Sequence, residues 1–286
     1  MNSTQQKYWR SSLGTDPPYV VGVLNVTPDS FSDGGTFLTV DEAISHAKAL
    51  RSAGADIIEV GGESTRPGSK AISEKEEMAR VLPIVEALAP TMFISVDSYK
   101  SQTAEACLKV GAKMVNDISA FRADPKMGEV ISKHGASVVL MYSKETGSSP
   151  HVSESKKDYK DVVKEIVEFL LQRIDLCVKC AIDPDKIIID TGMGRFLSHD
   201  PKYSWEVLQR YEEFKLIAEK APLLIATSRK GFLGGDLKDR DTVSQLTALI
   251  ACERGASFIR THNVMMAREF LNLEAAVESS RGGGDG

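Results

Sequence analysis

Residues 21–35 read VGVLNVTPDSFSDGG, an apolar run that ends at Asn25 and continues into a long polar loop. The run 21–24 has the length and composition of a buried parallel strand, so Asn25 is expected at the end of that strand. Residues 26–35 contain one proline, two glycines, two aspartates and a single aromatic residue, Phe31, and the loop extends to about residue 39. Connections in α/β units usually span about 2–6 residues, so this length predicts a functional loop rather than a passive connector.

The same alternation of an apolar run, a polar turn and a helical pattern repeats along the chain. Strands are predicted at residues 21–24, 56–60, 93–96, 113–115, 137–140, 186–189, 223–226 and 257–259. Apolar residues at helical spacing follow each strand, over about 41–53, 73–89, up to 110, 125–134, 158–180, 203–220, 242–254 and 264–277. Eight strand–helix units in strict alternation predict a single (β/α)8 TIM barrel. A doubly wound open sheet is the alternative, and it would not require eight units.

The expected organisation is an N-terminal extension (1–18), a TIM-barrel domain (19–278) and a flexible tail (279–286). A chain of 286 residues suits one domain of this kind. The first 18 residues are polar and contain no apolar core, so they indicate neither a signal peptide nor a membrane span.

Charge and cysteine content narrow the class of partner. The chain has 35 Lys and Arg residues against 40 Asp and Glu residues, a net charge of −5, and no long basic run. This composition indicates neither a nucleic-acid partner nor an anionic membrane, so small-molecule partners are expected. The four cysteines do not form a disulfide framework, and Cys177 and Cys180 lack a second pair of metal ligands. A reduced, cytoplasmic protein is therefore expected.

Eight polar or charged residues fall at or just beyond the carboxyl ends of the predicted strands. They are Asn25, Glu63, Asp97, Asn116, Asp190, Lys230, Arg260 and His262. TIM barrels place their active sites at this end. One such residue is ordinarily a strand terminator that meets water, but eight around one mouth predict a binding site.

The residue types indicate what that mouth binds. Asp97, Asn116 and Asp190 end nearly apolar strands, so they would enter a partly desolvated pocket that suits a flat polar heterocycle with adjacent N–H donors. A structural salt bridge to Lys230 is the alternative. Residues 228–234 (SRKGFLG) and 260–262 (RTH) carry cations beside a hydroxyl and an imidazole. Phosphate sites in TIM barrels often form after strands seven and eight, so an anion site is expected there.

Several of these segments together resemble the signature segments of dihydropteroate synthase. They are residues 25–35, 61–68 (GGESTRPG), 96–98 (VDS), 116–117 (ND), 228–234 and 260–262, and the resemblance covers residues 19–275 in order. It implies an enzyme of folate biosynthesis that uses Mg²⁺. The implied reaction joins 6-hydroxymethyl-7,8-dihydropterin diphosphate to 4-aminobenzoate and releases diphosphate. A homodimer is implied by the resemblance alone.

The resemblance also implies roles for individual residues. The pterin ring would be held by Asp97, Asn116, Asp190 and Lys230, with Met141 packed on it. The diphosphate and its Mg²⁺ would be held by Asn25, Arg260 and His262, with Asn25 as the metal ligand. The 4-aminobenzoate site would be formed by Phe31, Thr65, Arg66, Pro67 and Ser228. Asp33, Lys230 and Arg260 would be the catalytic residues, with Phe31 and Asp33 closing over the site.

These roles predict a dissociative, SN1-like substitution without a covalent enzyme intermediate. Diphosphate leaves readily once its charge is neutralised, which Mg²⁺, Arg260 and a protonated His262 would do. Positive charge then develops on the pterin methylene, and Asp33 would stabilise it. The aniline nitrogen of 4-aminobenzoate is neutral and weakly basic, so it needs a ready electrophile more than a general base.

Three segments depart from the family pattern. Residues 191–198 read TGMGRFLS in place of the usual Pro followed by Gly-Ile-Gly-Phe-Gly-Lys. Tyr142 and Ser143 stand where the family has His-Met, and Asn263 stands where it has Asp. A run similar to 191–198 occurs in the sulfonamide-insensitive branch of the family, so Phe196 would exclude sulfonamides by its bulk. Lineage drift in an ordinary enzyme is the alternative.

Two other functions stay open. A methyltetrahydrofolate-dependent methyltransferase shares a pterin-binding barrel of this kind, but it has no use for a diphosphate site or for the loop 27–35. A catalytically silent pterin-binding paralogue would account for the departures. Every pterin and diphosphate residue of the pattern is present, which favours the synthase.

Overall fold

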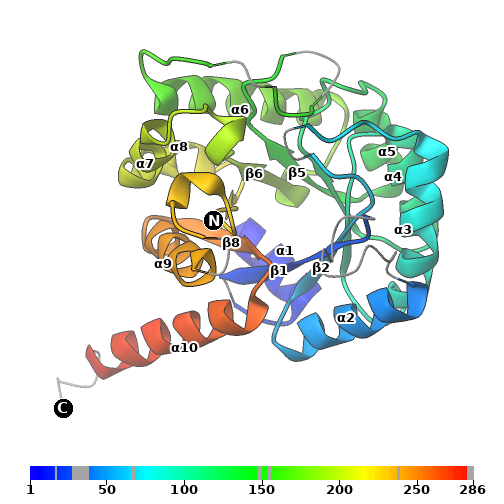
Figure 1. Cartoon of the computed structure of the whole chain (residues 1–286), viewed down its shortest axis with the longest axis horizontal. Helices are drawn as coiled ribbons and strands as arrows, with labels where there is room; N and C mark the ends of the chain where they lie inside the picture. The colour runs from blue at the N-terminus through cyan, green and yellow to red at the C-terminus, as the bar shows by residue number, and fades with distance from the viewer. Residues whose placement is uncertain are drawn as a thin grey trace.

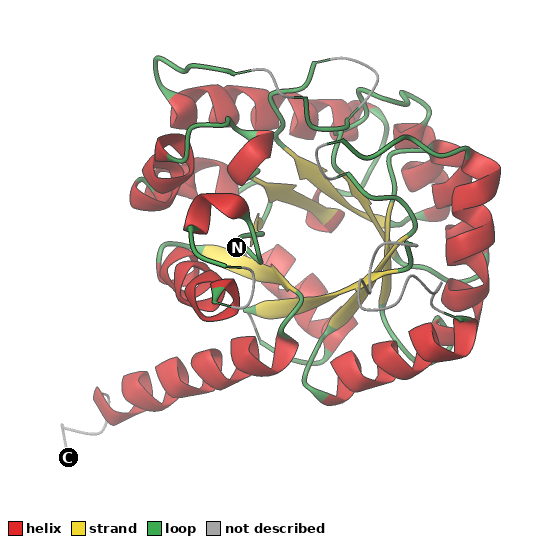
Figure 2. Cartoon of the chain, in the orientation of Figure 1, coloured by secondary structure: helices red, strands yellow, loops and turns green. Residues whose placement is uncertain are grey.

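The computed structural model describes residues 1–16, 18–27, 39–65, 68–146, 150–153, 156–236 and 239–281. Eight parallel strands form a closed barrel in chain order, with β8 beside β1. Figures 1 and 2 show the helices arranged around this ring of strands. The predicted (β/α)8 TIM barrel is therefore confirmed, and the doubly wound open sheet is excluded.

The strands lie within two residues of the predicted runs. They are β1 Tyr19–Asn25, β2 Ile57–Gly61, β3 Ile94–Asp97, β4 Met114–Asp117, β5 Ser137–Met141, β6 Ile187–Asp190, β7 Leu223–Ile225 and β8 Ala256–Thr261. Their residues are almost all buried because a parallel barrel is covered on both faces.

Ten α-helices occur in the described part of the chain. They are α1 Ser3–Leu13, α2 Val40–Ser52, α3 Glu74–Leu88, α4 Ser101–Lys109, α5 Met127–His134, α6 Val162–Lys179, α7 Lys202–Gln209, α8 Lys215–Ala218, α9 Arg240–Glu253 and α10 Val264–Arg281. Short 3-10 turns occupy η1 Pro184–Lys186, η2 Gly194–Phe196, η3 Tyr211–Phe214 and η4 Gly231–Leu233. None of the helices in these described ranges is long and apolar enough to cross a membrane. The last helix reaches Arg281 and so includes the first residues of the predicted tail.

The single helix predicted for residues 203–220 is wrong, because the structure divides this segment into α7, η3 and α8. Tyr211 and Phe214 are both fully buried. They stand three residues apart, the spacing that a 3-10 turn places on one side. Packing of these two rings therefore favours a tighter turn over a continuous α-helix.

Helix α1 has no counterpart among the elements predicted from the sequence. The side chain of Asn2 accepts a hydrogen bond from the backbone of Gln5, and the Gln5 side chain accepts one from the backbone of Asn2. This capping box starts a helix in an otherwise polar segment. Trp9 is fully buried and meets Phe258 of β8 edge to face, with ring centres 5.1 Å apart. In Figure 1, α1 lies across the far opening of the barrel, so it closes the end opposite the carboxyl ends of the strands.

The core has two parts, as the alternation of side chains along each strand requires. One part lies inside the barrel, where Tyr19, Ile57, Met114 and Phe258 pack with Trp9. The other lies between the strands and the surrounding helices and takes the intervening strand residues, such as Val20, Ile58 and Val115. Residues two apart on a strand therefore face the same side.

Candidate active site

Strand alternation turns six of the predicted site residues toward the barrel interior. Their neighbours Leu24, Val96, Val115, Leu140, Ile189 and Ile259 pack in the outer core. The residues that follow these neighbours therefore face inward, and they are Asn25, Asp97, Asn116, Met141, Asp190 and Arg260. Register pairs Asn25 with Gly61, Gly61 with Asp97, and Asp97 with Asn116. It also pairs Met141 with Asp190, so these groups line one mouth.

Arg260 stands at the centre of the charged groups in this mouth. Its Nε lies 2.6 Å from Oε1 of Glu59, and its Nη2 lies 3.1 Å from Oδ2 of Asp97. Asn116 donates from Nδ2 to the other oxygen of Asp97, at 3.3 Å. One guanidinium thus joins strands β2, β3 and β8.

The electrostatics of Asp97 follow from this arrangement. Burial raises its pKa to about 7, and the negative charge of Glu59 adds to the shift while Arg260 opposes it. Burial alone would lower the pKa of Arg260, but Glu59 and Asp97 outweigh burial and raise it. Arg260 therefore stays charged, while Asp97 changes its protonation near neutral pH.

Asp190 and Lys230 carry opposite charges, and each shifts the pKa of the other through space. Burial raises the pKa of Asp190 to about 6 although Lys230 opposes the shift. Burial lowers the pKa of Lys230 to about 8 against the opposing charge of Asp190. Oδ1 of Asp190 accepts a hydrogen bond from the backbone of Gly192 at 2.8 Å, which fixes the carboxylate. Two groups with perturbed pKa values facing one mouth are typical of a functional site.

Asn116 has an unsatisfied acceptor. The residue is 4% exposed, and its Oδ1 has no hydrogen-bond partner among the described residues. A buried polar atom without a partner costs about 1–3 kcal/mol. A ligand with an N–H donor at this position would remove that cost.

The side chains of residues 228–230, which follow β7, point to different surroundings. Ser228 Oγ lies 2.9 Å from Nδ1 of His262, which brings these two predicted residues together. Arg229 has a positive φ of 58°, and its side chain forms an ion pair with Asp241 at 2.9 Å. Of the two cations, Lys230 is therefore the one that lies at the mouth.

Asn25 is the residue expected to ligate Mg²⁺, and its surroundings can be compared with what that ion requires. A Cβ placed on Gly61 would lie 3.4 Å from Oδ1 of Asn25 and 3.6 Å from Oδ2 of Asp97, so both oxygens border one small space. Within the described ranges, no group of three His, Cys, Asp or Glu residues could hold a metal by itself. Mg²⁺ commonly takes only one or two protein oxygens and completes its shell with water and substrate phosphate. The residues present fit that arrangement.

The loop after β2 is tied to its surroundings through Glu63. Its carboxylate pairs with Lys100, accepts a hydrogen bond from Tyr99 at 2.8 Å, and lies 2.5 Å from Nε2 of His151. The other ring nitrogen of His151 lies 3.2 Å from Ser69 Oγ. Glu63 thus anchors the loop from outside the mouth rather than lining it.

The 4-aminobenzoate residues are only partly covered by the structure. Thr65 is half-buried and lies in the loop between Glu63 and Ser69. Phe31, Asp33, Arg66 and Pro67 lie outside the described residues.

The residues that depart from the family pattern, in the segment 191–198 and at Asn263, differ in what they contact. Lys230 Nζ lies 4.8 Å from the ring centre of Phe196, a cation–π contact that places this ring beside the charged pair. Arg195 is exposed and its Nη1 lies 3.0 Å from Nδ1 of His199. Asn263 accepts a hydrogen bond from Met266 and so caps α10, a role that Asn fills as well as Asp.

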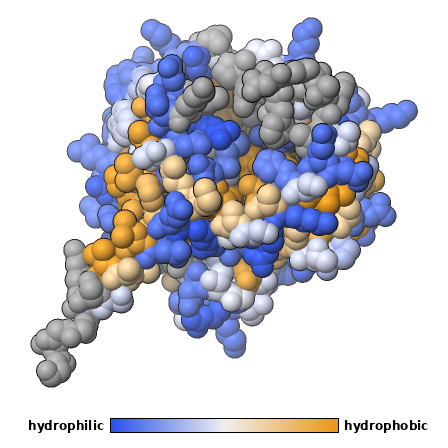
Figure 3. Space-filling view, turned by 60° about the horizontal axis from the view of Figure 1, so that its bottom comes forward, coloured by the Kyte–Doolittle hydropathy of each residue, from blue (hydrophilic) through white to orange (hydrophobic). Residues whose placement is uncertain are grey.

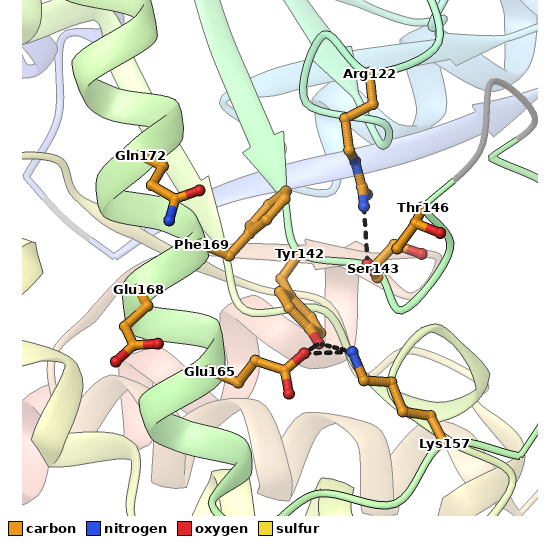
Figure 4. Close-up of a pocket in the computed structure, with 9 residues that line it drawn as sticks. All are labelled: Arg122, Tyr142, Ser143, Thr146, Lys157, Glu165, Glu168, Phe169 and Gln172. Atoms are coloured by element: carbon orange, nitrogen blue, oxygen red, sulfur yellow. Dashed lines mark hydrogen bonds and ion pairs between the residues drawn. The ribbon is translucent and has the colours of Figure 1, made fainter.

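Tyr142 points away from the mouth. Its hydroxyl donates to Glu165 of α6 at 2.7 Å, and Lys157 donates to the same hydroxyl at 3.2 Å. Figure 4 shows these groups beside Phe169 at a hollow of about 200 Å³ between the β5 loop and α6. Replacement of the family His at this position therefore changes the outer side of the barrel and not the charged cluster.

Glu59 is a residue of the mouth that was not among the residues predicted from the sequence. It lies within β2 and is 1% exposed, yet it contacts Arg260. Strand alternation could have identified it, because Glu59 stands two residues before Gly61 and therefore faces the same side as the mouth residues.

Comparison with known proteins adds an independent line of evidence. The family described as pterin binding enzyme matches residues 21–262. Dihydropteroate synthase from Bacillus subtilis is 35% identical over 269 residues, covering 92% of this chain and 90% of that protein. The structure of Xanthomonas albilineans dihydropteroate synthase with 4-aminobenzoic acid has a TM-score of 0.83 and 34% identity, over 92% of this chain and 94% of that one. The same bacterium's enzyme in complex with 7,8-dihydropteroate has a TM-score of 0.79 and 32% identity, with the same coverage.

Proposed function

Since the chain belongs to the dihydropteroate synthase family of pterin-binding enzymes, we propose that it forms dihydropteroate from 6-hydroxymethyl-7,8-dihydropterin diphosphate and 4-aminobenzoate. It is a transferase of a pterin-methyl group and acts in folate biosynthesis. The observation that carries the proposal is the convergence of Asp97, Asn116, Asp190, Lys230 and Arg260 on one barrel mouth. This set offers carboxylates and an amide to a heterocycle, and cations to an anionic leaving group.

The pterin ring would lie between the two charged pairs. Its ring N–H and amino donors would meet the carboxylates of Asp97 and Asp190 and the free Oδ1 of Asn116. Lys230 would donate to the acceptor edge of the ring. Met141, which is 4% exposed and faces inward, would pack on the ring face.

The diphosphate would lie at the side of the mouth formed by β8 and β1. Arg260 and His262 would donate to its oxygens, and Ser228 would orient the imidazole of His262 through the contact between Oγ and Nδ1. Asn25 would hold Mg²⁺, which when bound neutralises part of the diphosphate charge. The aminobenzoate site would add Thr65 and Ser228 to Phe31, Arg66 and Pro67.

The reaction would proceed by dissociative substitution. The bond between the pterin methylene and the diphosphate oxygen breaks first, with both electrons leaving on the diphosphate. The aniline nitrogen then forms the new C–N bond and loses a proton to solvent. Arg260 stabilises the leaving charge, and Asp33 would stabilise the methylene cation. Exchange of the bridging oxygen in labelled pterin diphosphate without 4-aminobenzoate is expected, and a trapped covalent enzyme adduct would contradict this course.

Sulfonamide insensitivity is a second proposal, motivated by the position of Phe196 beside Lys230. An aromatic ring there would narrow the aminobenzoate site against the larger sulfonyl group. Phe196→Gly should therefore lower the sulfamethoxazole concentration needed for inhibition while the KM for 4-aminobenzoate changes little. Equal inhibition of the wild type and the variant would favour lineage drift.

A homodimer is proposed from the surface of α9. Val243, Leu246 and Ile250 are 36%, 47% and 40% exposed, and their spacing places them on one helical face. Figure 3 shows hydrophobic residues gathered at the end of the molecule from which the C-terminal segment extends. A second copy of the chain would cover this face. Light scattering should give a dimer mass for the wild type and a monomer mass for Leu246→Glu.

The turnover assay tests the main proposal against the silent-paralogue alternative. The protein with both substrates and Mg²⁺ should form a product with the mass of dihydropteroate. Asp190→Asn, which keeps the shape of the side chain and removes its charge, should abolish most of that product. A folded wild-type protein that binds the pterin substrate without turnover would support the silent paralogue.

A further inference from the structure

Glu59 is the most deeply buried charged group of the mouth, and no role in the proposed reaction accounts for it. It is 1% exposed, in a strand whose other members are apolar or glycine. An ionised carboxylate at such a depth is costly unless a cation pairs with it. Its partner is Arg260, the residue expected to hold the diphosphate.

Register and alternation bring Arg260 and its two carboxylate partners together inside the barrel. Arg260 pairs with Val21 of β1 and Glu59 pairs with Val23, so β1 alone separates their two strands. Glu59 and Gly61 face inward on β2, and Asp97 pairs with Gly61 from the next strand. Alternate strands contribute to one layer inside a TIM barrel, so the side chains of Glu59 on β2 and Arg260 on β8 can meet there. The attraction of both carboxylates holds the guanidinium in place.

The hydrogen bonds fix which edge of the guanidinium is left for a ligand. Oε1 of Glu59 lies 2.6 Å from Nε and 2.5 Å from Nη2 of Arg260. Oδ2 of Asp97 also accepts a hydrogen bond from Nη2, at 3.1 Å. Nη1 of Arg260 has no hydrogen-bond partner within the part of the chain that the structure describes. A planar guanidinium held along one edge has a fixed opposite edge.

We propose that Glu59 is a positioning residue that holds Arg260 so that its Nη1 edge faces the leaving diphosphate. This inference rests on the proposed function, because it names how the diphosphate side of that site is organised. Glu59 touches neither substrate in this arrangement and acts through Arg260.

Coulomb's law alone predicts the opposite change in diphosphate binding, so the direction of that change tests the proposal. Glu59 adds a negative charge near an anionic substrate, so its neutralisation would by Coulomb's law tighten the binding of diphosphate. Positioning predicts weaker binding, because a guanidinium that rotates away loses its charge-assisted hydrogen bonds.

The experiment compares the wild type, Glu59→Gln, Arg260→Lys and the double variant. Inorganic pyrophosphate with Mg²⁺ should bind about 10-fold more weakly to Glu59→Gln, as expected for a lost hydrogen bond to a charged group. The kcat of Glu59→Gln should fall about 10- to 100-fold, as expected for a misplaced catalytic group. The KM for 4-aminobenzoate should stay unchanged. In the Arg260→Lys background, Glu59→Gln should have almost no further effect, because the lysine lacks the edge that Glu59 holds.

The matched control is Asp56→Asn. Asp56 is a buried carboxylate that pairs with Arg268 just before β2, at the opposite end of the barrel. This variant should lower the melting temperature and leave pyrophosphate binding unchanged. Unchanged or tighter pyrophosphate binding by folded Glu59→Gln would overturn the proposal. It would also be overturned if the loss of pyrophosphate binding in the double variant equalled the product of the losses in Glu59→Gln and Arg260→Lys. Absence of dihydropteroate from the wild type would overturn the proposed function instead, and the pyrophosphate measurements would still decide the role of Glu59.

Discussion

Trp9→Ala is predicted to destabilise the whole barrel, although this residue precedes the first strand. Trp9 is fully buried and packs edge to face on Tyr8 and Phe258, at 4.9 and 5.1 Å between ring centres. The side chain fills the amino-terminal opening of the barrel together with Tyr19 and Phe93. Its removal would leave a cavity that only a movement of α1 could close.

The magnitude follows from two opposing effects. Truncation of a buried Phe or Trp to Ala usually costs about 3–5 kcal/mol of unfolding free energy. Nε1 of Trp9 has no hydrogen-bond partner among the described residues, so the truncation also removes a buried unsatisfied donor. The net loss should therefore lie at the lower end, about 3 kcal/mol. For a chain of this size the melting temperature should fall by about 6–10 °C.

Urea and thermal unfolding measure this loss, and Trp205→Ala is the control. The chain has two tryptophans, and Trp205 is 43% exposed on α7. Trp205→Ala should cost less than about 1 kcal/mol. Trp9→Ala should leave the KM values unchanged, because the amino-terminal end of a TIM barrel contributes to stability while substrates bind at the carboxyl ends of the strands. A loss for Trp9→Ala no larger than that for Trp205→Ala would refute the packing account of α1.

Two further predictions concern the mouth. Gly192 has a φ of +67° and a Cβ there would lie 2.2 Å from a backbone oxygen, so Gly192→Ala should displace the adjacent carboxylate turn and lower kcat/KM. Gly14→Ala shares the positive φ but meets nothing within 4 Å, so it should lower stability slightly and leave kcat/KM unchanged; equal kinetic losses would contradict this reasoning. The kcat/KM for pterin diphosphate should have a bell-shaped pH profile. It should fall as pH drops below about 7, because Asp97 takes up a proton, and as pH rises above about 8, because Lys230 loses one. A flat profile from about pH 5.5 to about pH 9.5, roughly 1.5 pH units beyond each limb, would exclude those ionisations from binding.

Much of the barrel and its mouth could be predicted because both depend on short-range patterns. Short, mostly apolar runs of residues predict the strands, and the polar residues at or just beyond their ends predict the mouth. Asn25, Asp97, Asn116 and Asp190 follow from that rule, since period-two alternation turns each of them inward. The anion groups after β7 and β8 follow from the usual position of phosphate sites in TIM barrels.

The parts that escaped prediction depend on contacts between distant segments. Glu59 interrupts an apolar strand, and its meaning appears only when Arg260 arrives from the last strand, 201 residues later. The α1 helix has a weak apolar pattern, and its stability comes from Trp9 docking on Phe258. The division of residues 203–220 likewise follows from tertiary packing of Tyr211 and Phe214. In each case tertiary structure decided what local propensity left open.

The most direct measurement of the central claim is diphosphate release from 6-hydroxymethyl-7,8-dihydropterin diphosphate in the presence of Mg²⁺, with and without 4-aminobenzoate. Sustained release is expected only with 4-aminobenzoate, in equal amounts with dihydropteroate. Lys230→Met, which removes the cation and keeps most of the chain length, should reduce both together. Release of diphosphate without matching dihydropteroate, or no release from a folded protein that binds the pterin substrate, would contradict the central claim.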